Sequence, residues 1–409
     1  MTNMATATAY RPTKTSSKSE GPALRVLGAL SASHMVNDMM QSLLLAIYPV
    51  LKGKLALSFA QIGVITLTYQ LTASLFQPLV GLYGDRRPVR YALPIGMCST
   101  LCGLVILAFA PSFAVVLLSA SLIGFGSAVF HPESSRIARF ASGGRHGFAQ
   151  SLFQVGGNTG TAFGPLLAAA VIVPYGQHSV AWFALAALCG VVLLTLVSRW
   201  YAAQRITSTA SKATIESAYP RHVVLGAVAV LLVLIFSKYF YIAGLSSFYT
   251  FYLIEKFGLS VQSAQVHLFL FLFASALGTL LGGPVGDRIG RKPVIWASIL
   301  GVAPFALLLP HADLTWTTLL TVVIGFMLSS AFSAILVYAQ ELMPGNVGTV
   351  SGLFFGFAFG MGGLGAACLG LLADRTSVAF VYQVIAYLPL LGVVTALLPR
   401  RAPKNVSIA

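Results

Sequence analysis

Charged residues are scarce in this sequence, and acidic residues are the scarcest of them. Asp and Glu together number 10 against 25 Lys and Arg, and the four types make up only 9% of the 409 residues. Hydrophobic residues make up 57%, and the mean hydropathy is +0.85. A chain this apolar cannot cover itself with a polar surface, which excludes a soluble domain. The composition predicts an integral membrane protein, with the lipid bilayer as a partner.

Cysteines and nucleotide-binding motifs are also few. The four cysteines stand in apolar runs, and their spacing predicts neither disulfides nor a zinc site. No Gly-x-x-x-x-Gly-Lys-Ser/Thr phosphate loop occurs, which excludes an ATP-driven pump. The net charge of +15 would favour nucleic acid in a soluble protein, but here the basic residues stand in short loops beside apolar segments. We expect no metal, no cofactor and no nucleic acid.

Apolar segments long enough to cross a hydrocarbon core of about 30 Å, roughly 20 helical residues each, occur twelve times. The predicted spans are residues 24–51, 60–83, 91–110, 113–138, 147–173, 179–201, 222–253, 262–286, 293–310, 315–342, 347–373 and 378–398. The one long polar connection divides them six plus six. The sequence therefore predicts an all-α integral membrane fold of two six-helix bundles.

The predicted bundles comprise residues 24–201 and 222–399, joined by a linker at 202–221. Residues 1–23 are expected to form a disordered tail and 400–409 a second tail. With twelve spans, both tails and the linker share one side, and that side holds 20 of the 25 Lys and Arg. By the positive-inside rule this side is cytoplasmic.

Two loops between apolar runs carry similar charged sequences, residues 283–292 (Gly-Pro-Val-Gly-Asp-Arg-Ile-Gly-Arg-Lys) and, 202 positions earlier, residues 81–90. Glycine lets two helix backbones approach closely. Asp287 and Asp85 are placed to accept from the exposed N–H groups of a neighbouring helix N-terminus. The alternative is a basic turn that only fixes orientation.

This pattern resembles the Gly-x-x-x-Asp-Arg-x-Gly-Arg-Lys signature of the major facilitator superfamily, found between the second and third helices of each six-helix half. Residues 283–292 match at every signature position, whereas Pro88 and Val89 depart from it in the first copy. Two copies in equivalent places favour a shared role in gating. The residues expected to carry it are Gly81, Asp85, Arg86, Gly283, Asp287, Arg288 and Arg291.

A second internal similarity relates residues 147–153 to residues 348–354 at an offset of 201. Together with the two loops, it sets the halves in parallel register. Such halves are expected to be related by an axis along the membrane normal, with the substrate bound between them near the midplane.

Ionisable residues inside predicted spans are functional candidates, because burying a charge in hydrocarbon is costly. In the first span His34, Asn37, Asp38 and Gln41 interrupt an apolar run, with His34 and Asp38 one helical turn apart. Desolvation favours a neutral carboxyl and a neighbouring imidazolium favours a charged one, so proton occupancy can respond to the side that the cavity faces. We expect proton coupling here. The alternative is a static polar cluster that joins helices.

The fourth span ends with His131, Glu133 and Arg136 near the cytoplasmic mouth. His131 and Glu133 are further candidates for the proton. Glu133 and Arg136 stand three residues apart, and they form either a structural ion pair or a gate. Arg136 is also a candidate to receive an anionic substrate.

In the seventh span Lys238 and Tyr241 begin a stripe at helical spacing, and a lone lysine facing a cavity is suited to hold an anion. The fifth span adds Gln154, Asn158 and, at residues 160–169, a sequence that resembles the antiporter motif of the superfamily, which favours export. The residues expected to contact substrate are Lys238, Tyr241, Arg136, Gln154, Asn158, Asn37 and Gln41.

Residues 33–38, 130–136, 142–147, 338–344 and 354–360 look like those of the fosmidomycin-resistance efflux protein family. The resemblance covers nearly all of the chain from 24 to 400. It implies a secondary transporter of the bacterial inner membrane that exports the anionic phosphonate fosmidomycin in exchange for protons. We expect a monomer.

Two rival functions follow from the same residues. An importer of a sugar or organic anion would have the same fold and differ in transport direction. A membrane enzyme using Asp38 and His34 as acid and base would need a nucleophile, and none stands with them in a recognisable constellation. We therefore expect a transporter and not an enzyme.

Overall fold

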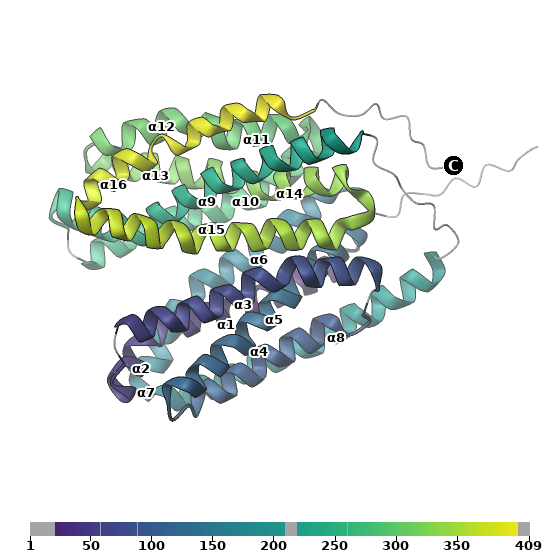
Figure 1. The fold of residues 1–409 in the computed structure, drawn as a ribbon, viewed down its shortest axis with the longest axis horizontal. Helices are drawn as coiled ribbons and strands as arrows, with labels where there is room; N and C mark the ends of the chain where they lie inside the picture. The colour runs from purple at the N-terminus through teal and green to yellow at the C-terminus, as the bar shows by residue number, and fades with distance from the viewer. Residues whose placement is uncertain (1–20, 58, 88, 209–218, 260, 400–409) are drawn as a thin grey trace, which may run out of the picture.

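The computed structural model describes residues 21–57, 59–87, 89–208, 219–259 and 261–399, and the elements in this part of the chain are helical (Figure 1). The first half contains α1 (Leu24–Ala46), α2 (Tyr48–Leu55), α3 (Phe59–Arg86), α4 (Ala92–Ala108), α5 (Phe113–Phe140), α6 (His146–Leu167), the π-helical η1 (Ala168–Ile172), α7 (Val173–Tyr175), η2 (Gln177–Trp182) and α8 (Phe183–Ser208).

The second half repeats this plan. It contains α9 (Arg221–Phe257), α10 (Val261–Ile289), α11 (Arg291–Ile299), η3 (Leu300–Val302), α12 (Ala303–Leu308), η4 (Leu309–His311), α13 (Leu314–Ser329), α14 (Ala331–Leu342), η5 (Pro344–Asn346), α15 (Val347–Arg375), α16 (Val378–Ile385) and η6 (Leu388–Leu397). Each of the twelve predicted spans coincides with one helix or with a run of consecutive helices, so the predicted fold of two six-helix halves is confirmed.

Several predicted spans are broken within their length. The ninth is divided into α11, η3 and α12, where Pro304 stands in the first turn of α12 and its ring cannot continue the preceding helix. In the other direction, α8 continues to Ser208, so the first part of the predicted linker is helical. Residues 1–20 of the predicted disordered tail at 1–23, residues 209–218 of the linker, and the predicted tail at 400–409 lie outside the described residues.

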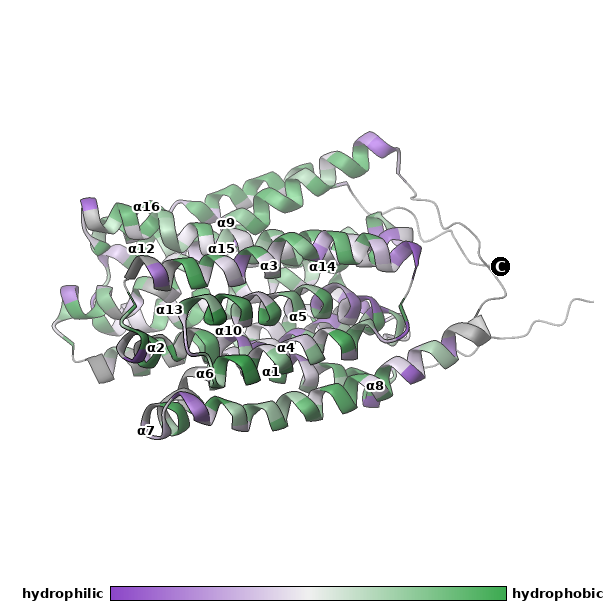
Figure 2. Ribbon diagram, turned by 60° about the horizontal axis from the view of Figure 1, so that its bottom comes forward, coloured by the Kyte–Doolittle hydropathy of each residue, from purple (hydrophilic) through white to green (hydrophobic). Residues whose placement is uncertain are grey.

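The sides of the bundle are apolar and its ends are polar (Figure 2). In the described part of the chain eight helices are long and apolar enough to cross a membrane, and Ala92–Ala108 is a shorter apolar helix. On α3 the stripe Leu67, Leu71 and Leu75 is exposed, which a bilayer permits and water would penalise.

The largest contacts between the halves are made by two helix pairs, α3 with α15 and α6 with α10. Glycines let each pair approach closely at one end of the molecule, which we call the gate end. There a Cβ on Gly81 would collide with the carbonyl of Gly348, and a Cβ on Gly283 with the carbonyl of Gly147. The predicted use of glycine for close backbone approach is thus confirmed in both copies.

A bulkier side chain at Gly283 should push the two halves apart at the gate end. We expect Gly283→Val to speed labelling of a Ser351→Cys probe by a maleimide at least about fivefold, because overpacking costs about 1–3 kcal/mol and Ser351 is buried. The measurement uses a chain whose four native cysteines are replaced by serine. Gly362→Val is the control, since a Cβ there meets nothing within 4 Å. Equal labelling in both variants would contradict the glycine argument.

Candidate functional site

Asp287, at the end of α10, accepts hydrogen bonds from the first backbone amides of α6. The Gly147 and Phe148 N–H groups each lie 2.9 Å from its carboxylate. These amides have no partner within their own helix, and the helix dipole favours a negative charge beside them. The contact joins the second half to the first, as predicted for this loop.

Asp85, at the end of α3, makes the equivalent contact with α15. Its carboxylate accepts from the Gly348 N–H at 2.9 Å, the Thr349 N–H at 2.7 Å and the Thr349 hydroxyl at 2.8 Å. The departures from the signature at 88 and 89 therefore leave this contact in place. Arg86 and Arg288, which follow the two aspartates, are exposed.

Each aspartate has an arginine beside it. Arg291 lies 2.6 Å from Asp287 and 3.2 Å from Glu341, whereas Arg136 lies 3.6 Å from Asp85 and pairs with Glu133. The structure therefore brings Glu133 and Arg136 to the gate end and does not bring them to the polar cluster around Asp38.

Sequence reasoning missed a buried polar network beside the gate. Its members, from α5, α6, α14 and α15, are Ser135, Gln150, Gln340 and Ser351. The Ser135 hydroxyl donates to Gln150 at 3.0 Å, and the Gln340 amide donates to Ser135 at 3.1 Å and to Ser351 at 2.9 Å. Gln150 and Ser351 occupy corresponding positions in the two halves, at the internal offset of 201, and this correspondence could have pointed to the network from the sequence.

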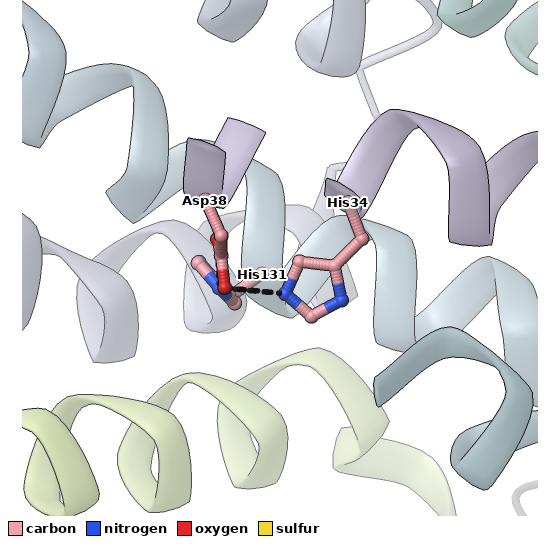
Figure 3. A group of neighbouring side chains, drawn as sticks. All are labelled: His34, Asp38 and His131. Carbon is pink, nitrogen blue, oxygen red and sulfur yellow. Dashed lines mark hydrogen bonds and ion pairs between the residues drawn. The ribbon is translucent and has the colours of Figure 1, made fainter. Parts of the chain in front are cut away.

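His34 and Asp38 of α1 meet His131 of α5 in a buried cluster (Figure 3). The two Nε2 atoms lie 3.2 Å apart, the His34 Nε2 lies 3.2 Å from an Asp38 oxygen, and the His131 Nε2 lies 3.6 Å from the other. Three of the four predicted proton candidates are thus together, and Glu133 is not among them.

The hydrogen-bond partners of the two rings determine which nitrogen carries hydrogen. The His34 Nδ1 lies 2.7 Å from the Phe153 carbonyl, and the His131 Nδ1 lies 3.0 Å from the Ser127 carbonyl. A carbonyl only accepts, so each Nδ1 carries a hydrogen and each neutral ring turns a bare Nε2 to the cluster. A proton on one of these Nε2 atoms would make it a donor to the Asp38 carboxylate.

The same three side chains also have the spacing of a metal site, the one such group found among the described residues. That the chain uses no metal remains a prediction. Asn37 and Gln41, expected to contact substrate, support the cluster, because their amides donate to one Asp38 oxygen at 3.0 and 3.1 Å, and Gln41 also lines a cavity beside it. The Tyr69 hydroxyl donates in turn to Gln41.

Lys238 is 3% exposed and lines a cavity of about 160 Å³ between α6, α9, α10 and the α13–α14 junction. Its Nζ lies 5.2 Å from the ring centre of Tyr239 and 5.3 Å from that of Phe332. No carboxylate of the described residues forms an ion pair with it. Gln154 and Asn158 line the same cavity, and the Asn158 amide donates to Thr279 at 3.0 Å.

Tyr241 does not reach this cavity. Its side chain is buried in the core of the second half with Leu245 and Tyr252, and Tyr239 occupies the cavity wall in its place. The stripe at helical spacing that pointed to Tyr241 is therefore a packing stripe, and the adjacent face of α9 carries Lys238 and Tyr239. A larger cavity of about 680 Å³, lined by both Asp38 and Tyr239, adjoins the first.

The family model described as Major Facilitator Superfamily matches residues 30–265 and 231–409. The chain belongs to the major facilitator superfamily. It is a multi-pass membrane transporter and not an enzyme. The solved superfamily transporter FucP, in the outward conformation, has a TM-score of 0.70 at 13% identity and covers 92% of this chain and 99% of its own. The human organic anion transporter MFSD10 has a TM-score of 0.69 at 17% identity over 93% and 100%. At these identities the likeness shows the fold alone.

Two bacterial superfamily relatives match nearly end to end. The fosmidomycin resistance protein of Escherichia coli (strain K12) is 65% identical over 93% of this chain and 94% of its own length. The uncharacterized MFS-type transporter YfnC of Bacillus subtilis (strain 168) is 42% identical over 91% and 92%. The resemblance to fosmidomycin-resistance proteins is thus confirmed.

The gate contacts predict the effect of removing one carboxylate charge. We expect Asp287→Asn to reduce transport strongly while leaving the protein folded. The asparagine side chain is neutral, so it lacks the negative charge that stabilises the contact with the α6 N-terminus, a contact made in this conformation only. Asp85→Asn should behave alike. Transport assays at equal expression measure the effect, with Arg375→Ala, on the exposed far end of α15, as control. Wild-type transport in both aspartate variants would contradict the gating role.

Proposed function

We propose that this transporter exports fosmidomycin or related small anionic phosphonates in exchange for protons, by alternating access. Its 65% identity to a protein named for fosmidomycin resistance supports this substrate. We place it in the bacterial inner membrane as a monomer with both termini in the cytoplasm, which the distribution of Lys and Arg supports.

The observation that carries the proposal is Lys238, a buried cation without an ion-pair partner among the described residues, in a cavity between the two halves. A lone buried charge is costly, so it is retained where a ligand of opposite charge compensates it. The surrounding rings of Tyr239 and Phe332 exclude water and leave the ammonium group accessible from the cavity. Asn158 and Gln154 offer amide groups to the rest of a small ligand.

The proton is carried, in this proposal, by Asp38 with His34 and His131. Two observations support it: the Nε2 atoms converge on a carboxylate, and Asp38 lines the larger cavity, where water can deliver a proton. Glu133 and Arg136 act at the gate with Asp85, because their contacts are made there. Arg136 then meets a substrate only after the gate opens.

The alternative is an importer or exporter of a sugar or organic anion on the same fold. Transport direction and substrate competition in inverted vesicles separate the two. Accumulation of fosmidomycin inside inverted vesicles, driven by an acidic lumen, supports the proposal, whereas its depletion or indifference to the gradient supports the alternative.

Loss of the buried charge should weaken the binding of an anion. We expect Lys238→Ala to lower the affinity for fosmidomycin at least about tenfold, because a hydrogen bond to a charged group contributes about 1.5–3 kcal/mol. Lys238→Arg should retain part of it. Titration of purified protein measures both, with Lys256→Ala, an exposed lysine at the far end of α9, as control. Unchanged affinity in Lys238→Ala would remove this lysine from the site.

A neutral residue at position 38 should uncouple transport. We expect Asp38→Asn to abolish accumulation against a gradient while substrate exchange continues, because the proton step is lost and the cavity is preserved. Asp313→Asn is the matched control, since Asp313 caps the helix α13. Proton-driven accumulation by Asp38→Asn in proteoliposomes would show that the proton is carried elsewhere, with Glu133 tested next.

A further inference from the structure

The central cavity continues sideways toward the bilayer. The cavity of about 680 Å³ next to Asp38 adjoins a third one of about 870 Å³ between α3, α9 and α15. The residues that line both are Gln70, Tyr239, Ser246, Phe359, Gly362 and Gly363. Tyr239 also lines the Lys238 cavity. Three adjoining cavities, each with Tyr239 in its lining, therefore extend from Lys238 to the outer face of the helices.

The outer rim of this space, which we call the window, has the apolar stripe of α3 on one side. Leu67, Leu71 and Leu75 line it and are 56%, 46% and 64% exposed. Leu364 of α15 lines the other side and is 50% exposed. Side chains this apolar and this exposed face lipid in a membrane protein, so the window opens into the hydrocarbon region.

Two sets of glycines on α15 explain why the window stays open. Near the gate end, a Cβ on Gly352 or Gly356 would collide with the backbone of α3, so these glycines serve helix packing. Further along, a Cβ on Gly360 or Gly362 meets nothing within 4 Å. At these positions the missing side chains leave space in the window.

We propose that the window admits the hydrocarbon tail of a single-chain anionic amphiphile, whose charged head binds at Lys238. The proposal rests on the anion site of the proposed function. The charge of the head complements the unpaired ammonium group, and the tail would lie along the adjoining cavities that share Tyr239. The tail then remains among apolar side chains and lipid while the head is desolvated between the halves.

Binding should then depend on tail length. Full-length protein in nanodiscs is titrated with methyl-, butyl- and hexylphosphonate, with empty nanodiscs as the baseline for partition into lipid. We expect the protein-specific affinity to rise about fourfold with each methylene that enters the window, the factor that burial of one CH₂ group gives. Gly360→Phe, which fills the window without reaching the central cavity, should remove this rise and leave methylphosphonate binding unchanged.

Gly28→Phe is the matched control, because a Cβ on Gly28 of α1, like one on Gly360, meets nothing within 4 Å. It should keep the wild-type dependence on tail length. A wild-type protein indifferent to tail length, as expected if a bilayer phospholipid fills the window, would overturn the proposal. So would Gly360→Phe with an undiminished rise.

A second measurement needs no variant. Hexylphosphonate with a photoreactive diazirine at the tail end should label α3 near Leu71 and α15 near Leu364, and labelling confined to other helices would overturn the proposal. Methylphosphonate tests the anion site separately. If Lys238→Ala binds it as wild type does, the proposed function fails, whereas loss of the tail effect alone refutes only the window.

Discussion

The structure depends on two aspartates, one in each half. Each accepts hydrogen bonds from the N-terminus of a helix in the other half. Asp287 reaches α6 and Asp85 reaches α15, each with bonds of 2.7–2.9 Å to backbone amides. Such a contact is favourable only when the start of the helix lies within hydrogen-bond distance of the carboxylate. It therefore stabilises one relative position of the two halves. Because both contacts lie at one end, the halves are fixed there and free to separate at the other.

Because the halves touch closely at the gate end only, the cavities that Asp38 and Lys238 line lie beyond that end. α3 and α15 stay in backbone contact as far as Gly356, beyond which Gly360 and Gly362 have open space, and the cavities begin where the helices part. The Asp38 cluster and Lys238 lie on opposite sides of this opening, one on each half. A movement that breaks the gate contacts must therefore also change the surroundings of both groups, which is what alternating access requires.

The sequence predicted the twelve spans and the gate because both rest on local patterns: long apolar runs, and glycine and aspartate at fixed spacing beside a helix start. It could not predict which face of α9 lines the cavity. Lys238 borders two apolar and aromatic stripes, one through Tyr241 and one through Tyr239, and periodicity treats them alike. Only the packing of α9 against the rest of its half buries the first and exposes the second. The sequence also left open whether Glu133 lies with Asp38 or at the gate, because that depends on where α5 crosses α1.

The internal offset of 201 relates residues of the central cavity as well as residues of the gate. Applied to the cluster around Asp38, it relates Asn37 to Lys238, Asp38 to Tyr239 and His131 to Phe332. The second set meets in space as the first does, since the rings of Tyr239 and Phe332 lie 5.7 Å apart with Lys238 beside both. The two halves thus place corresponding residues at the same point of the cavity, with an acidic cluster in one half and a basic one in the other. The two gate contacts are alike because each holds a helix N-terminus with a carboxylate, whereas the proposed exchange of an anion for protons needs opposite charges on the two walls of the cavity.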